Sequence, residues 1–158
     1  MSDQPAADAP SNQLARRIAD RSAVVGVVGL GYVGLPLAVA LAECGYAVRG
    51  LDIAPDRVAR IAQGRSPIGD VDDARLEPLL RAGRLTASTD DAVLASCDAI
   101  FVCVPTPFDA NKTPDLRAVI AAAEAVAGRL RAGQLIILQS TTYPGTTRDL
   151  LADKLKRG

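Results

Sequence analysis

The sequence contains no histidine and no tryptophan, and its only aromatic residues are three tyrosines and two phenylalanines. Without an imidazole, the protein cannot use the general base of Ser-His-Asp hydrolases or of lactate-type dehydrogenases. So few rings leave little surface for stacking nucleic-acid bases, and 18 basic against 18 acidic side chains leave no net charge to attract a phosphate backbone. We therefore expect neither histidine-based catalysis nor a nucleic-acid partner.

Cysteine is also scarce. The three cysteines, Cys44, Cys97 and Cys103, form no CxxC pair, and without histidine they make no zinc-binding set. We expect no metal site and a reducing compartment. The three thiols are expected to be small buried hydrophobic groups.

Only residues 23–42 form a long run without a charged side chain, and on length alone such a run could span a bilayer. Four glycines and Pro36 interrupt it, however, and indicate a strand, a turn and a helix instead. The first ten residues carry acidic side chains where a secretion signal needs positive ones. The sequence therefore predicts a cytoplasmic protein without membrane contact.

Beyond residue 22 the chain alternates between short β-branched runs and segments with helical spacing of apolar residues. This alternation predicts an α/β protein of the Rossmann type, with a doubly wound parallel sheet. The expected helices cover residues 36–43, 56–63, 115–131 and 146–156, with shorter ones around Leu79 and after Thr89. The expected strands cover residues 23–28, 47–51, 85–88, 99–104 and 135–138.

The two ends of this domain are less regular. Residues 1–12, rich in Pro, Ala, Asp and Ser, are expected to be a disordered tail, and a short leading helix is expected at 13–20. The domain then covers residues 13–158. Because a complete fold of this type has about six strands, we expect the sheet to be truncated before its sixth strand. Strand 135–138 is then an exposed apolar edge.

The sequence Gly29-Leu-Gly-Tyr-Val-Gly34 lies between the first strand and the helix that follows it. GxGxxG in this context is typical of a dinucleotide site. Gly29 permits the tight turn, Gly31 lets the backbone approach a pyrophosphate, and Gly34 lets the helix pack closely on the strand. The phosphates are expected at the amino end of the helix, whose free N–H groups and dipole favour anions.

Asp52 ends the second strand, 23 residues after Gly29, which is close to the ~20 expected for a carboxylate that accepts the ribose hydroxyls. A carboxylate there disfavours a 2′-phosphate, so NAD is expected over NADP. Arg49 and Arg57 weaken this inference, since either could approach a phosphate. Two alternatives stay open: the turn binds FAD or S-adenosylmethionine, or it only packs a helix on a sheet.

Three ordered motifs carry a family resemblance, namely residues 27–38 (VVGLGYVGLPLA), 102–107 (VCVPTP) with 114–116 (PDL), and 140–147 (STTYPGTT). Together they resemble the nucleotide-sugar 6-dehydrogenases, the UDP-glucose/GDP-mannose dehydrogenase family. The third motif is most similar to the branch that acts on UDP-N-acetylglucosamine. Branches acting on UDP-glucose or UDP-N-acetylmannosamine, another β-hydroxyacid-type dehydrogenase and a non-catalytic nucleotide-binding or dimerisation module remain alternatives.

The resemblance implies two-step, NAD-dependent oxidation of the C6 alcohol of a UDP-sugar to the carboxylate, for polysaccharide precursors, in a homo-oligomeric enzyme. It also implies roles for particular residues. Thr141 donates a hydroxyl hydrogen bond in the reaction centre and so has a supporting catalytic role. Gln139 departs from the family pattern, which more often has a charged residue there, glutamate in the nearest branch. The implied cofactor-binding residues are Gly29, Gly31, Tyr32, Val33, Gly34, Asp52, Arg57, Val104, Pro105, Thr106, Ser140 and Thr141.

The family's catalytic cysteine, lysine and asparagine belong to regions beyond the first domain, and neither those nor the UDP-binding domain has a counterpart in this sequence. None of the three cysteines here lies in a context that matches the nucleophile. We therefore expect this chain by itself to bind NAD without turning over a UDP-sugar.

Overall fold

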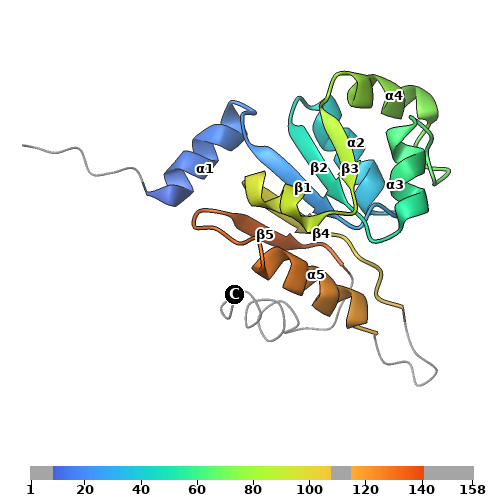
Figure 1. Cartoon of the computed structure of the whole chain (residues 1–158). Coiled ribbons are helices and arrows are strands. Elements are labelled where there is room, and N and C mark those ends of the chain that lie inside the picture. Colours follow the sequence, from blue (N-terminus) through green and yellow to red (C-terminus); the bar gives the residue numbers. More distant parts are fainter. Residues whose placement is uncertain (1–8, 108–114, 141–158) are drawn as a thin grey trace, which may run out of the picture.

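The computed structural model describes residues 9–107 and 115–140. Its centre is a parallel sheet of five strands in the order β3-β2-β1-β4-β5 (Figure 1). The predicted fold class is therefore confirmed: strand order reverses between β1 and β4, as in a doubly wound sheet. The strands are β1 (Val24–Val28), β2 (Ala47–Leu51), β3 (Leu85–Ser88), β4 (Ala99–Val102) and β5 (Leu135–Leu138).

The helices follow the strands in the expected order. The helices are α1 (Pro10–Ala19), α2 (Gly34–Glu43), α3 (Pro55–Ala62), α4 (Asp73–Arg81), the 3-10 helix η1 (Asp91–Ser96) and α5 (Arg117–Ala127). Most begin or end within a few residues of the predicted bounds. The predicted helix at 146–156 lies outside the described residues.

Of the described helices, α1 and α5 differ most from the prediction at their ends, whereas α2 begins two residues early and α3 is shifted by one residue. α1 begins at Pro10, so residues 10–12 belong to the helix and not to the expected tail. Proline favours the first position of a helix because its φ is already in the helical range. The expectation of a tail counted Pro10 only as part of a disordered composition and so missed this start signal. α5 ends at Ala127 rather than at residue 131, and its expected apolar stripe is only partly buried: Val119 and Val126 are buried, but Leu130 is exposed.

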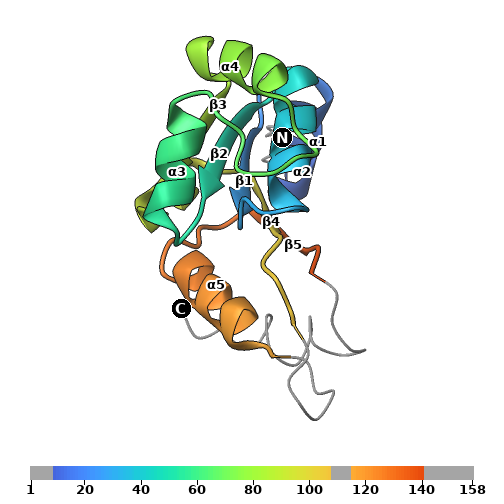
Figure 2. The same ribbon diagram turned by 90° about the vertical axis from the view of Figure 1, so that its right-hand side faces the viewer.

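The sheet separates two cores because alternate strand residues point to opposite faces. On one face Val27 and Val48 pack with residues of α2, α3 and α4. On the other, Val28 and Ile100 pack with residues of η1 and α5. The same division is visible in Figure 2, where α2, α3 and α4 gather on one side of the strands and α5 lies on the other. Buried on both faces, the central strands have the apolar composition of a parallel sheet.

β5 lies at one end of this sheet order and pairs with β4. Leu135 is 41% exposed, and the other three residues of the strand are half-buried. The described residues thus agree with the expected apolar edge. Among them, no helix is both long and apolar enough to cross a membrane.

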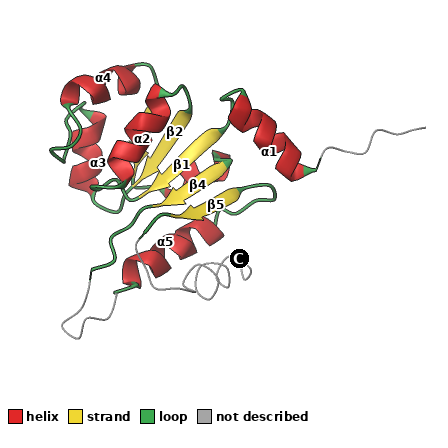
Figure 3. Cartoon of the chain, turned by 180° about the vertical axis from the view of Figure 1, so that it is seen from behind, coloured by secondary structure: helices red, strands yellow, loops and turns green. Residues whose placement is uncertain are grey.

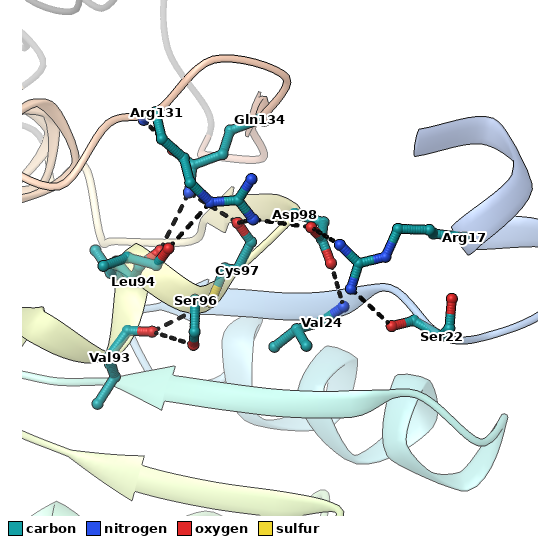
Figure 4. Close-up of polar contacts among 11 residues, drawn as sticks. Arg17, Ser22, Val24, Val93, Leu94, Ser96, Cys97, Asp98, Arg131 and Gln134 are labelled. Carbon is teal, nitrogen blue, oxygen red and sulfur yellow. Dashed lines mark hydrogen bonds and ion pairs between the residues drawn. The ribbon is translucent and has the colours of Figure 1, made fainter. Parts of the chain in front are cut away.

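At the edge where the strands begin, a buried aspartate joins four segments (Figure 4). Asp98, just before β4, accepts hydrogen bonds from the Val24 N–H at 2.7 Å and from Nη1 of Arg17 at 2.6 Å. Nη2 of Arg131, from the loop before β5, donates to the same carboxylate at 2.8 Å. Figure 3 shows α1 standing apart from the layered body, and α1 has no buried residue. Arg17, together with the Tyr46 hydroxyl that donates to the Ile18 carbonyl, therefore fixes this leading helix.

Candidate functional site

A cavity of about 490 Å³ opens at the opposite edge, where the strands end. Its volume lies within the range of about 300–1,000 Å³ typical of small-molecule sites. It lies where the strand order reverses, the position at which open α/β sheets bind ligands. Its walls are the ends of β1, β2 and β4, the glycine-rich turn, one face of α5, and the residues after β5.

The three glycines of the turn are required for three different reasons. Gly29 has φ +91°, and a Cβ on it would come within 2.9 Å of the Cys103 carbonyl oxygen. A Cβ on Gly34 would overlap the Gly29 carbonyl oxygen, so only glycine lets α2 start this close to β1. Gly31 lines the cavity, and a Cβ there would meet no atom within 4 Å. The space above Gly31 is therefore open to a ligand, as a phosphate cradle requires.

Tyr32 and Val33 complete the turn and also line the cavity. The two residues are 75% and 54% exposed, so both present their surface to the cavity and to solvent. They precede the first residue of α2, whose first turn carries no acidic side chain. The amino end of α2, with its partial positive charge, therefore lies at the cavity without a carboxylate of its own to neutralise it.

Asp52 follows β2 and lines the cavity, but only 4% of its surface is exposed. Its Oδ2 accepts from the Leu30 N–H at 2.7 Å, and its Oδ1 accepts from the Ala54 N–H at 2.9 Å. Nη1 of Arg57 donates to both oxygens, at 3.1 and 2.9 Å. The carboxylate therefore holds the glycine-rich turn and the start of α3 in place, a task that sequence reasoning did not assign to it.

The two arginines near Asp52 in sequence have different positions. Arg57 lines the cavity and pairs with Asp52. Arg49 lies opposite Gly26 in the register of β2 with β1, away from the strand end, and is not among the cavity-lining residues. Its Nη1 is buried without a hydrogen-bond partner. Of the two candidates, only Arg57 lies where a ligand phosphate could reach it.

Residues from the ends of β4 and β5 form the far wall. Val104, Pro105, Thr106, Gln139 and Ser140 all line the cavity. The Ser140 hydroxyl donates to the Val104 carbonyl at 2.7 Å, which ties the chain after β5 to the chain after β4. β4 ends at Val102 rather than at the predicted residue 104, because its neighbour β1 ends at Val28, opposite Val102. Thr141 lies outside the described residues.

Sequence reasoning missed the wall contributed by α5. Ala118, Ala121, Ala122 and Ala125 line the cavity from this helix. Their spacing of three and four residues places them on one helical face, so the signal was present in the sequence. It was overlooked because alanine is the commonest helix former and its presence needs no ligand to explain it. The remaining missed lining residues are Val28, Leu51, Ile53 and Cys103.

The three thiols differ in setting. Cys97 and Cys103 are buried as expected, whereas Cys44 is exposed at the end of α2, contrary to expectation. Burial raises the pKa of Cys103 to about 11, so this thiol, although it lines the cavity, stays protonated at neutral pH. Burial likewise raises the pKa of Cys97 to about 11. Neither buried thiol has the lowered pKa of a cysteine nucleophile.

Comparison with known proteins identifies this architecture. Residues 23–158 match the model of the NAD-binding domain of the UDP-glucose/GDP-mannose dehydrogenase family. The chain belongs to this family. The resemblance of the three motifs is thereby confirmed, NAD is the cofactor of the domain, and members of the family are NAD-dependent nucleotide-sugar dehydrogenases.

Similar proteins act on different sugars. The chain is 41% identical over 125 residues to the UDP-N-acetyl-D-glucosamine 6-dehydrogenase of Pseudomonas aeruginosa. This match covers 79% of this chain and 29% of that protein. The chain is 44% identical over 130 residues to the NDP-N-acetyl-D-galactosaminuronic acid dehydrogenase of Ralstonia nicotianae, covering 80% and 29%. A UDP-glucose dehydrogenase from Pyrobaculum islandicum superimposes with a TM-score of 0.80 at 38% identity, covering 85% and 32%. The chain thus spans less than a third of the length of these relatives.

Proposed function

We propose that the cavity is the NAD site of a UDP-sugar 6-dehydrogenase. The observation that carries this proposal is the open space above Gly31, at the point where strand order reverses, with Asp52 and Arg57 on its β2 side. The described residues fit the dinucleotide: glycine leaves room for a diphosphate, and the amino end of α2 favours its charge. NAD supplies the hydride acceptor for oxidation of the sugar alcohol.

Each part of the cavity then has a binding task. Gly29, Gly31, Tyr32 and Val33 form the diphosphate wall, and Asp52 with Arg57 receives the adenosine ribose. Gly34 does not line the cavity, and its part is to let α2 begin directly behind this wall. The carboxylate oxygens of Asp52 have about two acceptor positions each, and backbone N–H groups use one on each oxygen. The ribose hydroxyls therefore donate to the remaining acceptor positions on the Asp52 carboxylate, the positions to which Arg57 donates in the free protein. The remaining proposed cofactor contacts are Val104, Pro105, Thr106, Ser140 and Thr141.

For the whole protein we propose two-step oxidation of UDP-N-acetylglucosamine at C6 by a cytoplasmic homo-oligomer. The identity to the Pseudomonas aeruginosa enzyme supports this sugar, and the similar identity to an N-acetylgalactosaminuronic acid dehydrogenase makes a second amino sugar the competing substrate. Thr141 has the supporting catalytic role. The nucleophilic cysteine belongs to a further part of the protein. Cys97 and Cys103 are buried and protonated, and Cys44, although exposed, lies at the end of α2 and does not line the cavity.

Calorimetric titration with NAD and with NADP tests the cofactor site. We expect NAD to bind more tightly than NADP, because the Asp52 carboxylate opposes a 2′-phosphate. Asp52→Ala is expected to weaken NAD binding by about tenfold or more, since hydrogen bonds to a charged group contribute about 1.5–3 kcal/mol. Asp98→Ala is the matched control, because Asp98 is equally buried but lies at the other edge of the sheet.

The outcomes separate the alternatives. Absence of heat with NAD at millimolar concentration would favour a purely structural module, and NADP binding as tight as NAD would overturn the role given to Asp52. A spectrophotometric assay with UDP-N-acetylglucosamine and NAD is expected to show no NADH from this chain alone. Stoichiometric NADH would contradict the placement of the nucleophile in another region.

A further inference from the structure

Leu30 is the one side chain of the glycine-rich turn that points into the protein. It is 0% exposed, whereas its neighbours Tyr32 and Val33 are mostly exposed. Leu30 packs in the core with residues of α2, such as Leu35, and with Val48 of β2. The turn is therefore held to the protein body by this buried side chain as well as by its backbone.

The space for Leu30 exists because β2 carries a glycine beneath it. A Cβ on Gly50 would lie 2.8 Å from Cδ1 and 2.9 Å from Cδ2 of Leu30, and 3.2 Å from the Thr86 carbonyl oxygen. Gly50 is not among the glycines with positive φ, so its backbone conformation is open to any residue. Gly50 is thus required for space, and the space is filled by Leu30.

The backbone of the turn is held by the two residues that follow Gly50. The Gly29 N–H donates to the Leu51 carbonyl at 2.8 Å, and the Leu30 N–H donates to Asp52 Oδ2 at 2.7 Å. Three consecutive positions at the end of β2 therefore hold the turn, through one steric fit and two hydrogen bonds. The same end of β2 supplies the carboxylate that faces the cavity.

We infer that Leu30 and Gly50 are positioning residues for the phosphate-binding turn. Because the Leu30 side chain fills the space above Gly50, the two residues together set the distance between the turn and the sheet. This inference rests on the proposed NAD site. A shift of Leu30 moves Gly29 and Gly31 with it, because they are its neighbours in the chain. The fit of the diphosphate to the backbone thus depends on two residues that face the core and not the cofactor.

Gly50→Ala tests this inference directly. The added methyl group pushes Leu30 and the turn outward, because a closely packed core shifts when a carbon is inserted. The diphosphate then meets a displaced backbone, and we expect the Kd for NAD to rise about tenfold. Gly26→Ala is the matched control. Gly26 is also a strand glycine, and a Cβ there would lie 3.1 Å from Cys97 Sγ and 3.2 Å from Ile100 Cγ1, on the opposite face of the sheet. Both variants are expected to lose thermal stability, but only Gly50→Ala is expected to lose NAD affinity.

A double variant distinguishes positioning from general damage. Leu30→Ala alone is expected to weaken NAD binding severalfold because the turn loses its buried side chain. In the Gly50→Ala background, Leu30→Ala removes the two carbon atoms that lie closest to the new methyl group and leaves only the Thr86 carbonyl oxygen at 3.2 Å. The double variant is therefore expected to bind NAD more tightly than Gly50→Ala alone. Residues in contact show such non-additive effects. A double variant as weak as the product of the two single effects would refute the pairing.

The amide resonance of Leu30 gives a readout without cofactor. The Leu30 N–H donates a hydrogen bond to the buried Asp52 carboxylate, so its chemical shift depends on the position of the turn. We expect this chemical shift to change in Gly50→Ala and in the milder Leu30→Val, and to stay the same in Gly26→Ala. If wild type binds no NAD, the proposed function fails. If wild type binds NAD and Gly50→Ala affects neither the affinity nor this resonance more than Gly26→Ala does, only the positioning role is overturned.

Discussion

Two aspartates, Asp52 and Asp98, occupy equivalent settings at opposite edges of the sheet. Each is 4% exposed. Asp52 accepts hydrogen bonds from two backbone N–H groups and pairs with one arginine, whereas Asp98 accepts from one backbone N–H and pairs with two arginines. Asp98 lies at the edge where the strands begin, and its three donors, from β1, α1 and the loop before β5, close around it (Figure 4). Asp52 lies at the edge where the strands end, beside the cavity.

The comparison shows that a buried, paired carboxylate does not by itself mark a binding site. At both edges the carboxylate compensates for its burial by satisfying backbone donors that strands and turns leave free. What distinguishes Asp52 is the open space next to it, created by Gly31 and by the alanine face of α5. Function therefore depends on which edge of the sheet remains open.

Replacement of Asp98 is expected to have the largest effect on stability. Asp98→Ala leaves the Val24 N–H without its acceptor and separates Arg17 and Arg131 from their shared partner. Both arginines are 43% exposed and can turn to water, so we expect a loss of about 2–3 kcal/mol in the free energy of unfolding, below the ~3–5 kcal/mol of a fully buried pair. Urea denaturation measures it. NAD affinity should stay within about twofold, and a larger loss of affinity would break the division between the edges.

Replacing the arginine partner of each aspartate, Arg57 or Arg17, compares the two edges of the sheet with a smaller expected effect. Arg57→Ala and Arg17→Ala each remove a half-exposed partner of a buried aspartate, and each is expected to lower stability by about 1 kcal/mol or less. Only Arg57 lines the cavity. We therefore expect Arg57→Ala to change the Kd for NAD severalfold and Arg17→Ala to leave it unchanged in paired calorimetric titrations. Equal effects on affinity would show that α1 also contributes to the site.

The smallest expected effect is on the rates of thiol labelling, which are measured on the protein without any substitution. Cys44 is exposed and should react first with iodoacetamide at pH 8. Burial holds the pKa of Cys97 and of Cys103 at about 11, so both stay protonated at pH 8 and should react slowly in the folded protein. NAD is expected to slow Cys103 further, since this thiol lines the cavity, and to leave Cys97 unaffected. Mass spectrometry of each labelled peptide measures this, and equal protection of both thiols would indicate global tightening instead.

Much of the fold follows from local sequence. The strands Ala47–Leu51, Leu85–Ser88 and Leu135–Leu138 have the predicted bounds, because turn residues such as Gly83 and Gly133 mark where these short segments begin. Gly29, Gly45, Gly64, Gly83 and Gly133 adopt positive φ, where a glycine ends one element and starts another. The end of β4 could not be predicted in this way, since it depends on where the neighbouring strand β1 ends.

The site was predicted less completely than the fold. The turn, Asp52 and the residues after β4 and β5 were predicted as cofactor contacts, and they line one cavity because each follows a strand and all parallel strands end at the same edge. Arg57, also predicted, reaches this cavity from α3. Their contact with the cofactor stays a prediction. The alanines of α5 were missed because small side chains give no sign of their own as a cavity wall. The structural role of Asp52, which accepts a hydrogen bond from the glycine-rich turn, was missed because its backbone partner, Leu30, is 22 residues away.

By itself, the sequence determined the order of strands and helices, the glycine turn and its acid, since these depend on neighbouring residues and on backbone conformation. Only the tertiary structure decided which edge of the sheet stays open, which arginine faces the cavity, and that Leu30 needs the missing side chain of Gly50. The physical reason is that burial, space and hydrogen-bond partnership belong to side chains brought together from distant segments, such as Arg17 and Asp98, 81 residues apart. A local sequence pattern does not contain information about contacts between such distant residues.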